Sequence, residues 1–513
     1  MNTHVSSIEP TPASGAAEHV DVLIIGAGIS GVGAAYHLQA NSPGKSFAIL
    51  EGRESMGGTW DLFKYPGIRS DSDMYTLGYS FRPWTNPKAI ADGPSILSYV
   101  KDTARDHGID KHIRYSHRVI SADWSTPDAV WHIKAERGPL KEPVNFTANF
   151  VFMCGGYYNY DEAYTPEFEG RDDFKGQVIH PQFWPEDLDY TGKKVVVIGS
   201  GATAMTLVPS MTDKAEHVTM LQRSPTYVVS RPGEDAVANW LRKYLPAKLA
   251  YGITRWKNVL FGMYFFRMCM KKPKQVKEYL LNMVREELGE EEVKKHFTPT
   301  YKPWDQRVCL VPDGDLYESL KSGKASVVTD HIDRFTDKGI KLKSGKELDA
   351  DIIITATGLK LLAWNGLDVS VDGEAKQASD TVAYKGFMYS GIPNLASSFG
   401  YTNASWTLKC DLTCEWVCRL LNHMDANGYD QATPRFVEGE MEIEPWLGLS
   451  SGYVQRAMEQ FPKQGAKMPW KLHQNYARDM VMLRFGKMED EAMDFAKKPQ
   501  ALSAQVKAPL AAE

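Results

Sequence analysis

Two short apolar runs, each followed by a glycine-rich turn and a stretch of helical periodicity, dominate the hydrophobic pattern of this chain. The first is VDVLII over residues 20–25, followed by GAGISG, and the second is KKVVVI over residues 193–198, followed by GSGATA. Uninterrupted apolar runs are typical of parallel strands buried on both faces. A strand, a glycine turn and a helix in succession form the start of a dinucleotide-binding unit. The pattern therefore predicts an α/β protein with two such units.

The first unit has the G-x-G-x-x-G spacing of a Rossmann-like fold. Gly26 permits the tight turn, Gly28 lets the backbone approach a pyrophosphate, and Gly31 allows close packing of helix on strand. The next apolar run, SFAIL, ends at Glu51, which lies 20 residues beyond Gly31. A carboxylate at that place accepts hydrogen bonds from ribose hydroxyls. Strand, turn, helix and acid together predict a dinucleotide site.

The segment over residues 53–71 follows directly on this unit. Gly57 and Gly58 let the chain pass close to a flat ligand, and Trp60 is placed to stack on a ring or to wall it off. The alternative is a glycine turn with a tryptophan in the core. Because the segment follows a first-position Rossmann unit, we favour a flavin contact. The segment ends in the guanidinium, hydroxyl and carboxylate of residues 69–71, a composition that is also ordinary for a surface turn.

The second unit has the variant spacing Gly199, Gly201 and Ala204. The strand after it, HVTMLQ, ends in Arg223 and Ser224 rather than in an acid. A carboxylate there would repel a 2′-phosphate, whereas an arginine and a hydroxyl accommodate one. The second nucleotide is therefore predicted to be NADPH. The alternative is a structural arginine at the end of a strand.

The order of these patterns predicts one domain inserted in another. Residues 113–153 alternate as antiparallel strands, and two apolar runs end in glycine, at 155–156 and at 358, where we expect the chain to cross between domains. Residues 233–300 are helical, basic and aromatic. The predicted divisions are a disordered tail (1–18), the first part of an FAD-binding domain (19–165), an NADP-binding domain (166–350) with a helical insertion (233–300), the second part of the FAD-binding domain with C-terminal helices (351–497), and a flexible tail (498–513).

Composition excludes several other classes of protein. A net charge of −5 over 513 residues argues against a nucleic-acid partner. No histidine or carboxylate cluster completes a metal site around Cys410, Cys414 and Cys418, whose spacing indicates a buried stripe on a helix. Six cysteines without a disulfide-like arrangement suit a reduced, cytoplasmic protein.

One apolar segment raises the question of a membrane. The run NVLFGMYFF over residues 258–266 is too short to span a bilayer, which needs about 20 residues. We expect a buried helix here. The alternative is a peripheral membrane contact through residues 256–272, because lysines and arginines flank the run.

A third motif, FKGQVIHPQFWP, lies between the two units. Together with GAGISG, GGTW, GSGATA and ATG in this order, it resembles the class B flavoprotein monooxygenases. The linker matches the signature of the type I Baeyer–Villiger monooxygenases through Phe174, Gly176, His180, Trp184 and Pro185. Longer stretches, such as YTNASWTLKCDL, resemble the bacterial ethionamide-activating FAD monooxygenase subgroup. The resemblance covers residues 19 to 498.

The resemblance implies a role for each matching residue. FAD would contact Gly26, Gly28, Ser30, Gly31, Glu51, Gly58, Thr59, Trp60, Asp61, Leu62, Asp71 and Val119. NADP would contact Arg69, Ser70, Asp71, Gly199, Ser200, Gly201, Ala202, Thr203, Ala204, Met205, Thr206, Arg223 and Ser224. Arg307 would be the catalytic arginine and Asp71 its partner. Many relatives have a lysine before that arginine, where this chain has Gln306, so selectivity for NADPH over NADH would depend more on Arg223.

The resemblance also implies the reaction. The enzyme would use NADPH, FAD and O₂, through a flavin C4a-peroxide, to convert small apolar ketones to esters or lactones, and it would also oxidise sulfides or thioamides. The first alternative is a flavin-containing S- or N-oxygenase without Baeyer–Villiger activity. The second is a flavin sensor that catalyses nothing. A disulfide reductase of the same layout would need a CxxxxC pair near the first helix, where this sequence has no cysteine.

Overall fold

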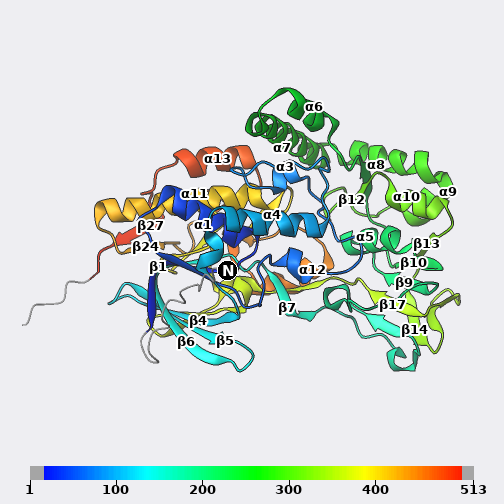
Figure 1. The fold of residues 1–513 in the computed structure, drawn as a ribbon, viewed down its shortest axis with the longest axis horizontal. Helices are drawn as coiled ribbons and strands as arrows, with labels where there is room; N and C mark the ends of the chain where they lie inside the picture. Colours follow the sequence, from blue (N-terminus) through cyan, green and yellow to red (C-terminus); the bar gives the residue numbers. More distant parts are fainter. Residues whose placement is uncertain (1–16, 499–513) are drawn as a thin grey trace, which may run out of the picture.

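The computed structural model describes residues 17–498. Most of the predicted tails, 1–18 and 498–513, lies outside the described residues; only residues 17, 18 and 498 are described. Of these, Glu18 is the first residue of a strand. Figure 1 shows two sheets, each with helices packed against it, and a group of helices above them.

The first sheet has nine strands within residues 17–498. Its centre is β1 (Glu18–Ile25), which pairs in parallel with β2 (Phe47–Leu50) and with β6 (Glu142–Met153). The short β3 (Ile113–Arg114) extends the sheet beyond β2. Helices α1 (Ile29–Asn41) and α11 (Trp406–Asn427) pack together over one face, and their side chains belong to one hydrophobic core with β1.

Residues 117–153 on the other side of this sheet form antiparallel strands, as the alternating pattern predicts. Strands β4 (His117–Ser125) and β5 (Val130–Arg137) form a meander with β6. Segments from much later in the chain complete the sheet: β19 (Asp368–Val371), β20 (Glu374–Lys376) and β23 (Leu395–Ser397). The first sheet is therefore interrupted by a long insertion.

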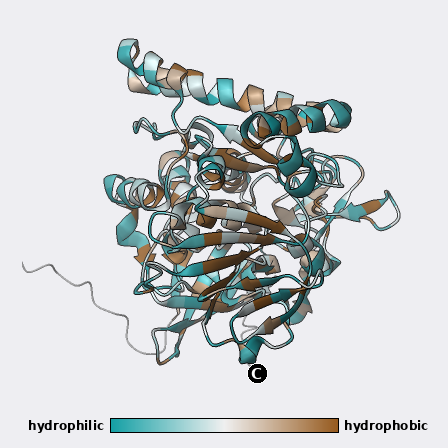
Figure 2. Ribbon diagram, turned by 90° about the vertical axis from the view of Figure 1, so that its right-hand side faces the viewer, coloured by the Kyte–Doolittle hydropathy of each residue, from teal (hydrophilic) through white to brown (hydrophobic). Residues whose placement is uncertain are grey.

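The second sheet has five parallel strands in the order β13-β10-β9-β17-β8. They are β8 (Gln177–Ile179), β9 (Lys194–Ile198), β10 (His217–Gln222), β13 (Ala325–Thr329) and β17 (Ile352–Thr355). Helices α5 (Ala202–Met211) and α10 (Asp315–Lys321) pack beside it. Figure 2 faces this part of the molecule and shows hydrophobic strands enclosed by more hydrophilic helices and loops.

The position of β17 corrects one predicted boundary. We expected the chain to return to the first domain at residue 351, but β17 pairs with β9 and β8 inside the second sheet. Its uninterrupted isoleucines resemble those of any doubly buried strand, so the sequence does not indicate which sheet they join. The return follows Thr355. There β18 (Leu359–Leu361) pairs with β7 (Tyr158–Ala163), and the two connections between the sheets run side by side.

The predicted insertion at 233–300 is helical. It contains α6 (Ala236–Tyr244), α7 (Ala247–Lys271), α8 (Pro273–Leu288) and α9 (Glu290–His296), with the paired strands β11 (Val228–Arg231) and β12 (Cys309–Pro312) at its base. No helix within residues 17–498 is long and apolar enough to cross a membrane. The run at 258–266 is not the buried helix we expected, because Leu260, Phe261 and Tyr264 are exposed while Val259 is buried.

Smaller elements complete the fold. They are α2 (Thr59–Leu62), α3 (Met74–Leu77), α4 (Gly93–Asp106), β14 (Ile332–Thr336), β15 (Gly339–Leu342), β16 (Glu347–Asp349), β21 (Ala383–Tyr384), β22 (Met388–Tyr389), β24 (Gln431–Pro434), β25 (Ile443–Pro445), α12 (Gly452–Ala457), β26 (Lys463–Gly465), α13 (Tyr476–Phe485) and β27 (Met493–Ala496).

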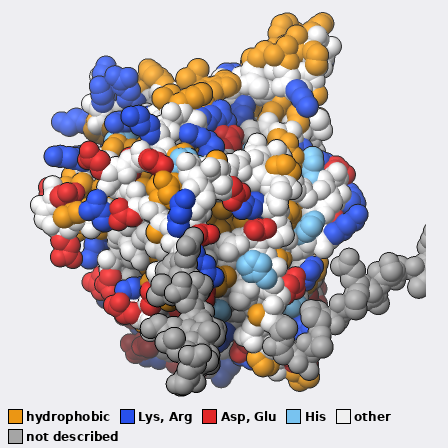
Figure 3. Space-filling view, turned by 90° about the vertical axis from the view of Figure 1, so that its left-hand side faces the viewer, with side chains coloured by type: hydrophobic (Ala, Val, Ile, Leu, Met, Phe, Trp, Pro, Cys, Tyr) orange, Lys and Arg blue, Asp and Glu red, His pale blue; other side chains and the backbone are white. Residues whose placement is uncertain are grey.

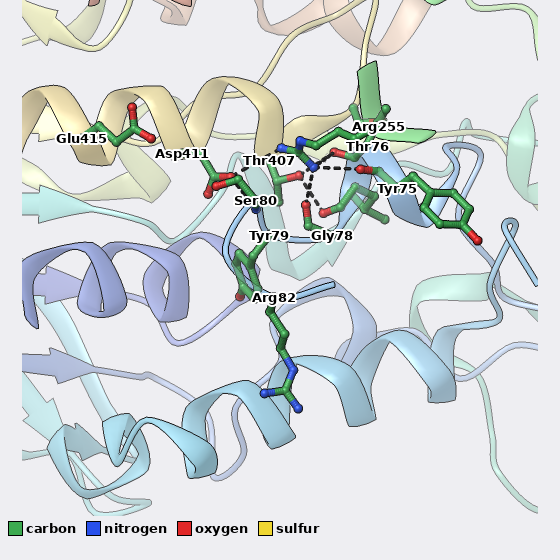
Figure 4. A network of polar contacts seen from close by, with 12 residues as sticks. Tyr75, Thr76, Gly78, Tyr79, Ser80, Arg82, Arg255, Thr407, Asp411 and Glu415 are labelled. Carbon is green, nitrogen blue, oxygen red and sulfur yellow. Dashed lines mark hydrogen bonds and ion pairs between the residues drawn. The ribbon is translucent and has the colours of Figure 1, made fainter. Parts of the chain in front are cut away.

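A buried arginine fixes α7 to the first domain (Figure 4). The Nη1 of Arg255 donates to the carbonyl oxygens of Tyr75 and Gly78, both at 2.8 Å, and its Nη2 lies 3.5 Å from Asp411 on α11. Asp411 also accepts a hydrogen bond from the backbone N–H of Ser80 at 2.9 Å. Burial lowers the pKa of Arg255, but neighbours that include Asp411 raise it above its ordinary value, so the guanidinium is charged.

Replacing Arg255 should destabilise the protein strongly. Arg255→Met leaves the buried carboxylate of Asp411 and two backbone carbonyls without their cation, which typically costs about 3–5 kcal/mol. The matched control is Arg267→Met, an exposed arginine on the same helix, where we expect a change within about 0.5 kcal/mol. Urea denaturation followed by circular dichroism measures both. Equal midpoints for the two variants would contradict the anchoring role.

Candidate functional site

The first glycine turn is in close backbone contact with the crossing at Gly155, just after β6. A Cβ on Gly26, whose φ is +98°, would lie 2.8 Å from the Cα of Gly155. A Cβ on Gly31 would lie 1.9 Å from the carbonyl oxygen of Gly26. Gly28 is different, because a Cβ there would meet only Gly58, at 3.6 Å. Gly28 therefore leaves open space at the start of α1, which has no side-chain cap for its first N–H groups.

Glu51 lies at the end of β2, beside this turn. Its Oε2 accepts a hydrogen bond from the backbone N–H of Ala27 at 2.8 Å, and its Oε1 accepts one from Arg53 at 3.0 Å. The side chain is buried, and burial raises its pKa. A carboxylate fixed in this way keeps lone pairs for ribose hydroxyls. The open helix start and this acid both fit a dinucleotide.

The segment after Glu51 contributes mostly backbone. Gly57 and Gly58 have positive φ, and the single turn α2 follows, with Thr59, Trp60, Asp61 and Leu62. Asp61 is buried and pairs with Arg53 at 3.0 Å, so its carboxylate is used within the segment. Trp60 packs against the core of the first domain.

The second glycine turn repeats the geometry of the first. A Cβ on Gly199, whose φ is +139°, would lie 2.4 Å from the carbonyl oxygen of Ala356, while a Cβ on Gly201 would meet nothing within 4 Å. The start of α5 again has no side-chain cap. The hydroxyl of Ser200 donates to the carbonyl oxygen of Ser224 at 3.2 Å, which fixes the turn to the end of β10.

The other residues predicted for this unit lie at or beside the turn. Arg223 is exposed beside Ser224, and it forms no ion pair with any residue between 17 and 498. The first turn of α5 presents Ala202 and Thr203 outward, while Ala204, Met205 and Thr206 face the core. An unpaired arginine next to an open helix start fits a phosphorylated ribose.

Arg307 lies where the two domains meet. Its Nη1 is 3.3 Å from the Oδ2 of Asp71, and it lies among Tyr157, Tyr158 and Tyr453. Burial alone would lower the pKa of Arg307, but Asp71 and the tyrosines raise it above its ordinary value. Its Nε is buried without a hydrogen-bond partner in the described structure. The guanidinium therefore keeps its charge and has a donor to spare.

The sequence did not reveal these tyrosines. Tyr157 and Tyr158 follow the glycine pair at the end of β6, and Tyr453 belongs to a C-terminal segment without a recognisable motif. Burial raises the pKa of Tyr158 and of Tyr453 to about 12, so both hydroxyls stay protonated at neutral pH. The only signal in the sequence was the position of residues 157–158 directly after a predicted crossing.

An aromatic cavity extends from this point. The ring of Tyr157 lies 5.2 Å from that of Phe399 and 5.4 Å from that of Trp406, and Phe399 lies 5.4 Å from Trp446. The Nε1 of Trp406 donates to the Oγ of Ser30 at 2.8 Å. The cavity is lined by Ile25, Val119, Met153, Gly155, Gly156, Tyr157, Leu362, Trp364, Asn365, Leu367, Tyr389, Ser397, Ser398, Phe399, Trp446, Phe461 and Pro462. It connects the first glycine turn with the 397–406 loop.

The three polar residues at 69–71 have different partners in the structure. Arg69 pairs with Asp315 at the start of α10, so its charge is matched within the protein. Ser70 is buried, and its Oγ accepts a hydrogen bond from the backbone N–H of Ser72 at 2.9 Å. Only Asp71 faces Arg307. The segment nevertheless borders the second domain, because a Cβ on Gly67 would lie 1.8 Å from the Oγ of Ser210 on α5.

The FKGQVIHPQFWP stretch forms the edge of the second sheet and a loop beside the crossing. Phe174 is buried against Phe335, and a Cβ on Gly176 would lie 2.2 Å from the carbonyl oxygen of Asp351. The Nδ1 of His180 accepts from the backbone N–H of Gln182 at 3.1 Å, and its Nε2 lies 3.3 Å from the carbonyl oxygen of Gly358. Burial lowers the pKa of His180, so the neutral ring bridges the two segments. Trp184 packs against the core of the second domain, just before Pro185.

The cysteines form the predicted buried stripe. Cys410, Cys414 and Cys418 are buried and free on α11, and burial raises the pKa of Cys410 and Cys418 to about 12. Within residues 17–498, no group of three or more His, Cys, Asp or Glu side chains is placed to hold a metal ion. These thiols pack as small apolar side chains.

A sheet with a parallel centre and a second, fully parallel sheet, each with an open glycine turn, and an arginine between them define a protein of the two-dinucleotide class. The family model described as flavin-binding monooxygenase-like matches residues 79–387, and that of an NAD(P)-binding Rossmann-like domain matches residues 24–87. The chain belongs to the flavin-binding monooxygenase-like family, and the resemblance seen in its motifs is confirmed.

Relatives match over nearly the whole chain. The FAD-containing monooxygenase EthA of Mycobacterium tuberculosis is 57% identical over 486 residues, which cover 94% of this chain and 99% of that protein. The probable FAD-binding monooxygenase AlmA of Acinetobacter baylyi is 48% identical over 492 residues, which cover 96% and 99%.

Solved structures show the same fold at low sequence identity. An oxidised steroid monooxygenase bound to NADP has a TM-score of 0.74 at 22% identity, covering 93% of this chain and all of that one. A cyclohexanone monooxygenase from Rhodococcus sp. Phi1 bound to NADP⁺ has a TM-score of 0.73 at 19% identity, covering 94% and 100%. The predicted α/β fold with two Rossmann-like domains is therefore confirmed.

Substitutions at two glycines of the first turn should have different effects, one on folding and one on flavin binding. Gly31→Ala places a methyl group against the backbone of Gly26, so we expect loss of folding or a large drop in melting temperature. Gly28→Ala meets only an ordinary contact with Gly58, so the protein should fold but lose its flavin, because the methyl group occupies the open space at the helix start. Melting curves and the flavin absorbance of the purified variants separate the two effects. A yellow Gly28→Ala protein with normal flavin content would contradict this assignment.

Proposed function

We propose that this flavoprotein monooxygenase uses FAD, NADPH and O₂ to convert ketones to esters or lactones, and that it also oxidises sulfides and thioamides. The observation that carries the proposal is the charged Arg307, paired with Asp71 between the two glycine turns. Tyr157, which neighbours Arg307, also lines the aromatic cavity, and this cavity favours a small apolar substrate. The FAD-containing relatives and the fold shared with structures that bind NADP support the two cofactors.

FAD is assigned to the first glycine turn. Gly28 and the uncapped start of α1 receive the pyrophosphate, and Glu51 receives the ribose. When bound and reduced by NADPH, the flavin supplies the chemistry that activates O₂. Ser30 in the first turn of α1 and Gly58, which meets Gly28 just before α2, lie at the same turn. With the residues of α2 and with Val119, which lies near Ile25, they complete the assignment. The chain's part is to hold this group and to exclude water around it.

NADPH is assigned to the second glycine turn. The open space at Gly201 receives the pyrophosphate, and Arg223 with Ser224 receives the 2′-phosphate. Arg69 is committed to Asp315, and residue 306 is a glutamine, so neither adds a free cation. Discrimination between NADPH and NADH therefore depends on Arg223.

The domain arrangement belongs to the same proposal. Residues 19–165 and the part of the chain after Thr355 form the FAD-binding domain, and the NADP-binding domain between them carries the helical insertion at 233–300. The two chain crossings, paired as β7 and β18, then lie between the cofactors. Peripheral contact of residues 256–272 with a membrane is also proposed, since apolar ketones and sulfides partition into lipid.

Arg307 is proposed as the catalytic group. As negative charge develops on the carbonyl oxygen of the substrate, a guanidinium already fixed by Asp71 stabilises it without reorganising. Its buried Nε has no partner in the described structure, so a donor is available for this oxygen. The same positive charge favours any anionic oxygen species at the site over its protonated form.

Removing this guanidinium should slow ester formation about a hundred- to a thousandfold. We expect Arg307→Ala to bind both cofactors and to let NADPH bleach the flavin, while product analysis by gas chromatography shows little ester. Arg307→Lys keeps a charge but loses the planar donor, so its activity should fall between the two. Ester formation by Arg307→Ala at the rate of the unsubstituted protein would contradict the assignment.

Removing the guanidinium of Arg223 should affect one nucleotide and spare the other. Loss of a charge-assisted contact worth about 1.5–3 kcal/mol raises the KM for NADPH about ten- to a hundredfold in Arg223→Ala. NADH lacks the 2′-phosphate, so its KM should not change and serves as the control. Both KM values are obtained from the initial rates of flavin-dependent oxidation of NADPH and of NADH. An unchanged KM for NADPH would contradict the 2′-phosphate assignment.

A further inference from the structure

The helical insertion presents an exposed apolar surface, which we call the outer face. Along α7, large apolar side chains recur every three or four residues on the side turned to solvent: Leu249, Ile253, Trp256, Leu260 and Tyr264. On α6 the same spacing exposes Val237, Trp240 and Tyr244. Each of these eight side chains is at least 40% exposed. Figure 3 shows hydrophobic side chains gathered along the top of the molecule, where Figure 1 places α6 and α7.

The opposite side of α7 is firmly held, so the outer face cannot turn inward. Arg255 is bonded to the first domain as described above (Figure 4), and the hydroxyl of Tyr251 donates to the carbonyl oxygen of Tyr79 at 3.0 Å. The amide of Asn258 donates to Asp73 at 2.9 Å, and Lys257 pairs with Asp235 at 2.5 Å. These contacts fix one side of the helix and leave the apolar stripe on the other.

The charges on the two helices that carry the outer face are of one sign. Between Ala236 and Lys277 the chain has ten lysines and arginines and no aspartate or glutamate, although its net charge is −5. Six of these basic side chains are exposed and form no ion pair with any residue between 17 and 498: Lys243, Lys248, Arg267, Lys271, Lys272 and Lys274. An apolar stripe within a cationic surround is complementary to an anionic bilayer surface.

The aromatic residues of the outer face also favour a bilayer surface. Four of the eight side chains are Trp240, Tyr244, Trp256 and Tyr264, and the rings of the first two lie 5.3 Å apart. Tryptophan and tyrosine favour the headgroup region, because the ring is apolar and its N–H or O–H reaches water. A second copy of this chain fits less well. A two-fold interface brings the same patch of both subunits together, so it would face cations with cations.

We propose that the outer face of α6 and α7 docks on a bilayer containing anionic lipid, with α7 lying at the level of the headgroups. The purpose of docking rests on the proposed function, since apolar ketones and sulfides partition into lipid and would reach the enzyme from there. Docking itself needs no catalysis. The surface is wider than residues 256–272, because α6 and the start of α7 contribute five of its eight apolar side chains.

Flotation of the holoenzyme with vesicles tests the docking. We expect the protein to float with equimolar phosphatidylglycerol and phosphatidylcholine, to float at least about tenfold less with phosphatidylcholine alone, and to be released by high salt. Absence of flotation with the anionic vesicles overturns the proposal. Equal flotation with both kinds of vesicle overturns the charge argument and with it the proposal.

Matched variants locate the surface. Leu260→Ser should weaken binding about tenfold, while Leu140→Ser, which removes a still more exposed leucine from the β5–β6 turn, should not. Lys243→Glu should weaken binding at least about fivefold, and Lys343→Glu, an exposed lysine after β15, should not. Equal effects of Leu260→Ser and Leu140→Ser would contradict the docking. A dimer that Leu260→Ser dissociates, without vesicle binding, would assign the face to a second copy instead.

Activity on a water-soluble ketone without vesicles separates the two proposals. All four variants should turn it over like the unsubstituted enzyme, because their side chains lie outside the cavity. A protein that floats but forms no ester would overturn the proposed reaction and leave the docking intact. A protein that forms ester but does not float would overturn the docking and leave the proposed reaction intact.

Discussion

The contact of each glycine turn with the backbone of a chain crossing sets the geometry on which the site depends. A side chain on Gly26 would collide with Gly155, and one on Gly199 would collide with Ala356. Since the crossings pair with each other as β7 and β18, both dinucleotide units are tied to the same short ribbon. His180 joins this ribbon by bridging Gln182 and Gly358. The FKGQVIHPQFWP stretch therefore lies where the two units are held together.

This arrangement explains how a charged arginine is kept at the domain boundary. Burial opposes the charge of Arg307, and the carboxylate of Asp71 from the other domain favours it. The pair also depends on the domains staying together, which the Arg69–Asp315 ion pair supports from the neighbouring segment. Further out, Arg255 holds the helical insertion against the first domain, so the insertion is fixed relative to the site.

The sequence predicted what local backbone chemistry dictates. Gly26, Gly28, Gly31 and Gly199 were readable because a turn that approaches a phosphate tolerates few other residues. The sequence did not indicate which distant segments pack against each other. The isoleucines of β17 suit either sheet, so the boundary at 351 was wrong, and nothing near Tyr453 indicates that it lies beside Arg307. The run at 258–266 was predicted to be buried because hydropathy does not record which side of a helix faces water.

The assignment of Baeyer–Villiger activity is the central claim, because it distinguishes this enzyme from a flavin-dependent oxygenase that acts only on sulfur or nitrogen. The most direct measurement supplies the holoenzyme with NADPH, isotopically labelled O₂ and equal amounts of a methyl ketone and a thioether, and identifies the products by mass spectrometry. Insertion beside the carbonyl predicts an ester that carries one labelled oxygen, together with labelled sulfoxide. Labelled sulfoxide with unchanged ketone would contradict it.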